Sequence, residues 1–379
     1  MPQEELTGGL LNSTDSRKVN ELRGGAEKFL PRLIFFELTT RCNLRCIHCR
    51  AEAGDAESGE LTTEEVKRIL TEISEVSKPI VILTGGEPLY RKDIFELAGH
   101  TVSLGMKAAL ASNGTLINQQ TAEKIREAGV SRVSISLDGG REETHDRFRG
   151  ITGSFREAVA GIKNLQAAGV QTQINSTIAS HNINEVDKIL NLALGLKVNA
   201  LHIFMLVPVG CGVQIADKMM LSPQEYENCL NWFYEQWRAH PELEFKATCA
   251  PHFYRILNQR GKKDGIILPK SSSGMSAMTR GCLAGTAVCF ISNRGEVQPC
   301  GYLPLVTGRL RTQSFRDVWF NSEIFGNLRD PSNLKGKCGR CEFRKLCMGC
   351  RARAYYDKDN YMDEEPYCLY EPLVTIEKV

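Results

Sequence analysis

The distribution of cysteine is the feature that most constrains this chain. It has 14 cysteines in 379 residues, and most of them fall in two groups. The first group spans residues 42–49 and the second spans residues 282–368. Grouped cysteines in an intracellular enzyme indicate metal binding rather than disulfides. Three cysteines stand apart from both groups: Cys211, Cys229 and Cys249. Of these, Cys249 reads as a plain buried residue.

Short apolar runs alternate with amphipathic segments after residue 32. We predict strands at residues 33–38, 80–84, 107–112, 132–137, 170–178 and 200–204, and helices at 62–76 and 153–169. Thr62 or Thr63 is a suitable N-cap for the first helix. Such alternation predicts parallel strands with right-handed crossovers. Six units rather than eight favour an α/β fold, a partial (β/α)6 barrel of the TIM type, with ligands at the carboxyl ends of its strands.

The character of the chain changes along its length, which suggests domain limits. Residues 1–31 are predicted to be an N-terminal extension, and residues 32–210 the partial barrel. Residues 211–276 read as a helical linker or substrate region, with Ser222 as the N-cap of its main helix and a mobile loop at 262–276. Residues 277–372 form the cysteine-rich domain, and residues 373–379 form a tail.

Composition excludes several classes of protein. The net charge of +2 gives no electrostatic basis for binding nucleic acid or a membrane surface. No run approaches the roughly 20 apolar residues of a membrane helix, and the polar first 25 residues lack the apolar core of a signal peptide. We therefore expect a cytoplasmic protein with no membrane span and no nucleic-acid partner.

The first cysteine group has the spacing of a cluster-binding loop. Cys42, Cys46 and Cys49 directly follow the first predicted strand. A 4Fe–4S cluster takes four ligands, usually cysteine, so three thiolates from one loop would leave one iron open to another ligand. A structural zinc site, or a cluster completed by a distant cysteine, is the alternative.

Small polar residues follow the next strands. Gly85 and Gly86 permit a close backbone approach to a ligand, and Glu87 can accept hydrogen bonds from an ammonium group. Ser112 and Asn113 end the third strand, and Ser136 ends the fourth. Ordinary turns would explain each of these alone. Together they indicate a polar ligand such as a nucleoside.

These motifs resemble the radical S-adenosylmethionine (SAM) superfamily over about residues 33–210. The resemblance implies that Cys42, Cys46 and Cys49 hold a 4Fe–4S cluster whose open iron binds SAM. It also implies a set of SAM contacts, in which the usual aromatic residue before the third cysteine is replaced by histidine: His48, Gly85, Gly86, Glu87, Pro88, Ser112, Asn113, Ser136 and Arg149.

The second cysteine group is open to two interpretations from its spacing alone. Its pairs of cysteines can hold one zinc ion, whereas eight cysteines suffice for two clusters. The layout resembles the SPASM domain of radical SAM maturases, which implies two auxiliary 4Fe–4S clusters. Their implied ligands are Cys282, Cys289, Cys300 and Cys350 for the first, and Cys338, Cys341, Cys347 and Cys368 for the second. The spacing Cys347-x2-Cys350, where many maturases have three intervening residues, leaves one cluster as the alternative.

Several segments resemble the radical SAM enzymes of the alternative heme pathway, among them residues 31–54, 246–255, 297–303 and 349–356. The resemblance is closest to the heme b synthases, which oxidatively decarboxylate iron-coproporphyrin III. Arg50 stands where the siroheme-derivative deacetylases carry tyrosine, which favours the heme b synthases, or the related enzymes of heme d1 synthesis, over the deacetylases. Because the porphyrin carries propionates, cations are expected around it. The candidates are Lys246, Arg255, Arg280, Arg351 and Arg353, with His252 as a candidate iron ligand.

The implied partners are an iron-porphyrin substrate, an external low-potential electron donor and an electron acceptor. A peptide or protein maturase is a second enzyme hypothesis, but the roughly 30 residues before the barrel are too few for a peptide-recognition domain. An iron–sulfur electron carrier is a third hypothesis, and it would not need a SAM pocket.

Overall fold

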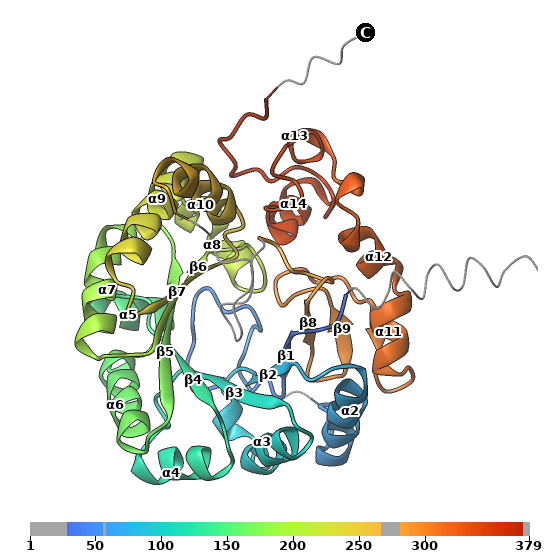
Figure 1. Cartoon of the computed structure of the whole chain (residues 1–379). Coiled ribbons are helices and arrows are strands. Elements are labelled where there is room, and N and C mark those ends of the chain that lie inside the picture. Colours follow the sequence, from blue (N-terminus) through green and yellow to red (C-terminus); the bar gives the residue numbers. More distant parts are fainter. Residues whose placement is uncertain (1–28, 56–57, 267–280, 374–379) are drawn as a thin grey trace, which may run out of the picture.

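The computed structural model describes residues 29–55, 58–266 and 281–373, and one ten-stranded sheet dominates it. The strand order is β10-β9-β8-β1-β2-β3-β4-β5-β6-β7, and all neighbours from β8 to β7 are parallel. β9 and β10 continue the sheet in antiparallel pairing. Figure 1 shows the sheet curving around a centre, with helices α2–α7 outside it and helices α11–α14 beyond β8.

The strands lie close to where the alternating pattern predicted them. They are β1 (Leu33–Glu37), β2 (Ile80–Thr84), β3 (Lys107–Ser112), β4 (Arg132–Ser136), β5 (Gln171–Ile178), β6 (Ala200–Met205), β7 (Glu244–Thr248), β8 (Val288–Ile291), β9 (Glu296–Gln298) and β10 (Gly308–Arg309). The predicted α/β fold is confirmed. The sheet is wider than six parallel strands, because β7 and β8 add one parallel strand at each side.

The helices cover the outer face of the sheet and build the C-terminal part. They are α2 (Thr63–Val76), α3 (Ile94–Ser103), α4 (Gln119–Glu127), α5 (Glu142–Arg149), α6 (Ser154–Ala167), α7 (Val186–Gly195), α8 (Gly212–Met219), α9 (Pro223–Ala239), α10 (His252–Lys263), α11 (Phe315–Asn321), α12 (Glu323–Arg329), α13 (Gly336–Gly339) and α14 (Arg351–Lys358). Short 3-10 turns lie at η1 (Pro88–Tyr90), η2 (Ile183–Glu185) and η4 (Pro331–Asn333).

Two predicted helix starts are confirmed in detail. The Thr62 side chain accepts a hydrogen bond from the Glu65 amide, and the Glu65 carboxylate accepts one from the Thr62 amide. Ser222 and Glu225 form the same reciprocal box at the start of α9. Each box satisfies two of the amides that a helix start leaves unpaired.

Side chains alternate across the parallel strands, and this alternation separates two environments. On β1, Ile34 and Phe36 are fully buried in the main apolar core, which the outer helices share. Leu33 and Phe35 point to the opposite face, toward the interior of the barrel. The interior face therefore remains available to line a site.

Several expectations fall outside the part of the chain that the structure describes. They concern most of the N-terminal extension, most of the predicted loop at 262–276, the candidate Arg280 and most of the tail. Within the described residues, no helix combines the length and apolarity needed to cross a membrane.

Candidate active site

A cavity of about 370 Å³ lies inside the barrel, and residues at the carboxyl ends of the strands are among those that line it. Its wall takes residues from every parallel strand, together with the loop after β1 and several residues of the cysteine-rich segment. Ligand sites of barrel folds lie at this end of the strands. The predicted SAM and substrate contacts are therefore expected in this cavity.

Cys42, Cys46 and Cys49 all border this cavity, on the loop after β1. The Leu44 amide donates to Cys42 Sγ at 3.4 Å, and the Ala53 amide donates to Cys49 Sγ at 3.3 Å. Burial raises the pKa of the Cys42 thiol to about 11, so a thiolate there needs a nearby cation such as iron. Three free thiols at one wall, with backbone amides pointing at the sulfurs of Cys42 and Cys49, suit a cluster with one iron facing the cavity.

The glycine pair serves the cysteine loop as well as the cavity. A Cβ on Gly86 would come within 2.6 Å of the carbonyl oxygens of Thr40 and Arg41, and one on Gly85 would meet Thr39 at 2.6 Å. The Gly86 amide donates to the Thr39 carbonyl at 2.8 Å. The two glycines thus allow β2 to hold the cysteine loop against the sheet, while their own backbone borders the cavity.

Glu87 lies differently from the sequence expectation. Its side chain is fully buried and is not part of the cavity wall. The carboxylate accepts hydrogen bonds from Ser112 Oγ at 2.9 Å and from the Asn113 amide at 2.7 Å. Burial raises its pKa to about 7 against those hydrogen bonds. Glu87 therefore braces the end of β3 instead of presenting a carboxylate to a ligand, and Pro88 next to it is buried in η1.

Ser112, Asn113 and Ser136 do border the cavity. Asn113 Nδ2 donates to Asn43 Oδ1 at 2.9 Å and lies 3.9 Å from Cys42 Sγ. The end of β3 is thereby joined to the cysteine loop. A ligand that bridges the open iron and these polar groups would contact both elements.

His48 and Arg149 meet at Asp138, a carboxylate that is fully buried. Arg149 lies 2.5 Å from Asp138 Oδ2, and His48 Nε2 lies 3.6 Å from the same oxygen. Arg149 also donates to Cys46 Sγ at 3.6 Å. The His48 ring stacks on Phe148 at 3.8 Å between centroids. Burial lowers the pKa of His48 to about 3, so its imidazole is neutral.

Sequence reasoning missed most of the polar wall opposite the cysteine loop. These residues could have been found because polar residues recur at every second position of buried strands, and every second side chain of a strand points to the same face. The inward polar residues on β4–β7 that border the cavity are Ser134, Ser136, Gln173, Asn175, Thr177, His202, Lys246 and Thr248.

Part of the first predicted auxiliary set borders the same cavity. Cys282, Cys300 and Cys350 line it, but Cys289 does not. Cys289 is fully buried in the main core, on the helix-facing side of β8. The expected four-cysteine set is therefore incomplete in the structure, because strand geometry turns Cys289 away.

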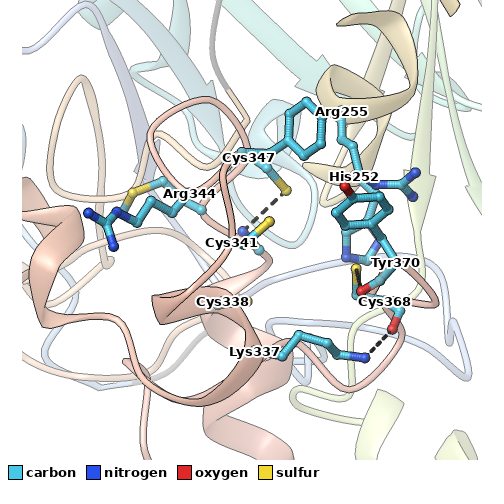
Figure 2. Close-up of a pocket in the computed structure, with 12 residues that line it drawn as sticks. His252, Arg255, Lys337, Cys338, Cys341, Arg344, Cys347, Cys368 and Tyr370 are labelled. Atoms are coloured by element: carbon cyan, nitrogen blue, oxygen red, sulfur yellow. Dashed lines mark hydrogen bonds between the residues drawn. The ribbon is translucent and has the colours of Figure 1, made fainter. Parts of the chain in front are cut away.

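The second predicted auxiliary set surrounds a space of its own, shown in Figure 2. Cys338, Cys341, Cys347 and Cys368 all line a small cavity of about 20 Å³. Amides point at two of the sulfurs: Glu365 N lies 3.4 Å from Cys338 Sγ, and Gly349 N lies 3.4 Å from Cys347 Sγ. Such contacts are typical of cluster sulfurs. No three or more histidine, cysteine or acidic side chains among the described residues are gathered tightly enough for a single metal ion.

Of the predicted substrate cations, Lys246 on β7 lies at the cavity wall. Burial lowers its pKa to about 8. An anionic carboxylate beside it would favour its charged form.

Three of the arginine candidates, Arg255, Arg351 and Arg353, are corrected, because each already has partners within the protein. Arg255 binds Glu227 at 2.6 Å, and Arg353 binds Glu365 at 2.9 Å. Arg351 touches the cavity wall, but its guanidinium donates to the Asp363 carbonyl at 2.6 Å.

His252 is corrected in the same way. It is fully buried beside the second cysteine set, 3.9 Å from Glu365, and does not line the large cavity. It therefore cannot reach an iron bound in that cavity.

Comparisons with known proteins agree with this geometry. The Radical SAM superfamily matches residues 36–193, and SPASM, an iron–sulfur cluster-binding domain, matches residues 282–350. The AdoMet-dependent heme synthase of Methanosarcina barkeri is 49% identical over 90% of this chain and 97% of its own length. The protein of the same name from Oleidesulfovibrio alaskensis is 47% identical over 90% of this chain and 88% of its own.

The fold is also found among solved structures. Streptococcus suis SuiB bound to S-adenosylmethionine aligns with a TM-score of 0.72 at 17% identity, over 94% of this chain and 81% of that one. That likeness shows the fold alone, whereas the sequence identities define the family. The chain belongs to the radical SAM enzymes that carry a SPASM domain, in the family of the AdoMet-dependent heme synthases.

Proposed function

We propose that this enzyme oxidatively decarboxylates two propionates of iron-coproporphyrin III to vinyl groups and so forms heme b. The observation that carries the proposal is the shared cavity, bordered at one wall by Cys42, Cys46 and Cys49 and at another by Cys282, Cys300 and Cys350. A substrate in it would touch both the place where a hydrogen atom is taken and a place where an electron can leave. The relatives named AdoMet-dependent heme synthase support the choice of a tetrapyrrole.

SAM and 4Fe–4S clusters are the cofactors of this family. Cys42, Cys46 and Cys49 would hold the cluster that binds SAM. With an electron from an external low-potential donor, these cofactors would supply radical abstraction of a hydrogen atom from the propionate carbon β to the carboxylate, with 5′-deoxyadenosine as the by-product. The substrate would then lose carbon dioxide and one electron, and a vinyl group would remain. Cys282, Cys300 and Cys350 border the same cavity, so a cluster that they hold would be a candidate acceptor for that electron.

The protein's own groups bind and orient the two reactants. We assign SAM to the wall made by Gly85, Gly86, Ser112, Asn113 and Ser136, beside the cysteine loop. Arg149 stays charged because Asp138 and Cys46 stabilise the guanidinium against the cost of burial. It binds Asp138, which also faces His48, and it donates to Cys46 Sγ, so it braces the cysteine loop at the SAM end of the cavity.

The porphyrin would take the remaining part of the cavity. Leu33, Phe35, Phe204, Phe290 and Tyr302 give that part large apolar and aromatic surfaces, which suit a flat macrocycle.

Lys246 is the residue we assign to a propionate carboxylate, because it is a half-buried cation on this wall. Its pairing would fix which edge of the macrocycle lies near SAM.

The test is anaerobic turnover of the reconstituted enzyme with SAM, a reductant and iron-coproporphyrin III, followed by mass spectrometry. The expected product has lost two carboxyl groups and two further hydrogens, with 5′-deoxyadenosine formed alongside. Cys42→Ala should abolish SAM cleavage and leave the auxiliary clusters. Cleavage of SAM with an unchanged porphyrin would refute the substrate assignment.

A parallel reaction with a siroheme derivative separates the main alternative. A deacetylase would remove acetate side chains from that substrate and leave the propionates of iron-coproporphyrin III untouched. Product from the siroheme derivative alone would therefore replace the proposal with the deacetylase.

A further inference from the structure

The cysteine that completes the first auxiliary set lies at the end of β7. Cys249 directly follows Thr248 and borders the same cavity as Cys282, Cys300 and Cys350. It also packs with Cys300 and Cys350 around one small apolar cluster that includes Val207. Four free cysteines therefore face one space, and this is the number of ligands that a 4Fe–4S cluster takes.

Strand geometry excludes Cys289 from that space. On β8, Val288 and Phe290 line the cavity, and Cys289 lies between them. Successive side chains of a strand point to opposite faces, so Cys289 points to the helix-covered side. Its paired residue on β1 is Ile34, which is also fully buried in the main core. Bringing Cys289 inward would require a one-residue slip of the β1–β8 pairing, which would turn every side chain of β8 over.

The backbone at Cys249 is held in a costly conformation. Its φ is +55°, in the left-handed region that side chains other than glycine seldom adopt. Such strain persists only where the surroundings enforce it, and it is concentrated at functional sites. Here the left-handed turn follows β7 and places Cys249 at the cavity wall.

One buried network fixes Cys249 and Cys350 together. Tyr226 Oη donates to the Cys249 carbonyl at 3.1 Å, and Arg353 donates to Tyr226 Oη at 2.7 Å. Arg353 also pairs with Glu365, whose carboxylate accepts the Cys350 amide at 2.6 Å. The network joins the end of β7 to the start of α14, and it gives Arg353 a positioning task in place of a substrate contact.

We propose that Cys249 is the fourth thiolate ligand of the first auxiliary cluster, together with Cys282, Cys300 and Cys350, and that Cys289 is a packing residue of the core. The site then takes one ligand from the barrel and three from the cysteine-rich segment. The cluster would thus link these two parts of the fold covalently.

The experiment compares Cys249→Ala with Cys289→Ala in a background whose Cys42, Cys46 and Cys49 are alanine, so that only auxiliary clusters contribute. Iron and sulfide are counted, and Mössbauer and EPR spectra are recorded on the anaerobically reconstituted proteins. Cys289→Ala should retain about eight irons per chain. Cys249→Ala should lose between one and four of them. In that variant, an added small thiol should change the EPR spectrum by binding the exposed iron.

Two further measurements keep the result interpretable. The spectrum of the second auxiliary cluster serves as an internal sign that the domain is folded. Cys249→Ser, which preserves the volume and offers an oxygen ligand, should keep the cluster with an altered Mössbauer spectrum. Retention of all irons and an unchanged spectrum in Cys249→Ala, or loss of the first auxiliary cluster in Cys289→Ala, would overturn the assignment.

Discussion

Replacing Gly86 by alanine tests how the cysteine loop is held. The new Cβ would lie 2.6 Å from the carbonyl oxygens of Thr40 and Arg41, and 2.9 Å from Ala53 Cβ. Carbon atoms do not approach carbonyl oxygens this closely, and backbone oxygens cannot swing aside as the end of a side chain can. The loop must therefore retreat, which stretches the 2.8 Å hydrogen bond from the Glu87 amide to the Arg41 carbonyl.

The size of the effect follows from these contacts. Overpacking costs about 1–3 kcal/mol, and loss of one hydrogen bond adds about 1 kcal/mol. Each 1.4 kcal/mol corresponds to about tenfold in a rate or an equilibrium. Because Cys42 is the residue after Arg41, the displacement acts on the SAM cluster. We expect SAM cleavage by Gly86→Ala to fall about thirtyfold to several hundredfold.

The assay is anaerobic formation of 5′-deoxyadenosine with excess reductant, after iron counting on each preparation. Gly99→Ala is the matched control, because a Cβ at Gly99 in α3 meets nothing within 4 Å. Alanine there should be neutral or stabilise the protein by up to about 1 kcal/mol. If Gly86→Ala cleaves SAM as fast as Gly99→Ala and has the same thermal stability, then the close packing of β2 against the loop does not position the cluster.

Three further substitutions follow from single contacts. Lys246→Met should raise the KM for iron-coproporphyrin III about tenfold or more, since a charged contact is lost. In the wild type, the KM should increase at pH values above about 8, the pKa of Lys246, because the side chain then loses its proton. Lys246→Arg should remove that increase. Burial opposes the charge of Asp138, but Arg149 holds the pKa of this carboxyl below its usual range. Asp138→Asn should lower the free energy of unfolding by about 3–5 kcal/mol in denaturant unfolding at pH 7. This difference from the wild type should shrink as the pH falls through the lowered pKa of Asp138. Ser222→Ala should cost about 1 kcal/mol through loss of the α9 cap and leave the iron content unchanged.

The elements of the barrel could be predicted because local patterns decide them. The six strands found from sequence are buried apolar runs, and the cap at Thr62 is a local hydrogen-bond arrangement. β7 was missed because its sequence, EFKAT, carries Lys246 and Glu244 among few apolar residues. Its place in the sheet depends on pairing with β6, which brings His202 opposite Lys246. The sequence of one segment alone does not determine which distant segment it pairs with.

Charged residues were harder to place for a similar reason. A sequence that names Arg255, Arg351 and Arg353 as cations does not say which carboxylates or carbonyls lie beside them. Arg353 meets Glu365 and Tyr226, which come from segments 12 and 127 residues away. Burying a guanidinium is costly unless partners satisfy it, so arginines buried at 1% exposure serve the protein's own network.

Spacing between cysteines carries information about distance along the chain, but not about the face of the sheet on which a cysteine lies. Cys282, Cys289 and Cys300 follow one another in the sequence, and the resemblance to the SPASM layout implied a common cluster for them. The face on which Cys289 lies follows once β8 is recognised as a strand, because only alternate residues of the run Val288–Ile291 can face a ligand. A cysteine at the middle of such a strand shares its face with Ile291 and its burial with Ile34. A ligand that must meet cysteines from another segment is better supplied by a strand end, where the chain is free to turn. Cys249 occupies such a position, and its left-handed backbone is the turn that brings it to the cavity.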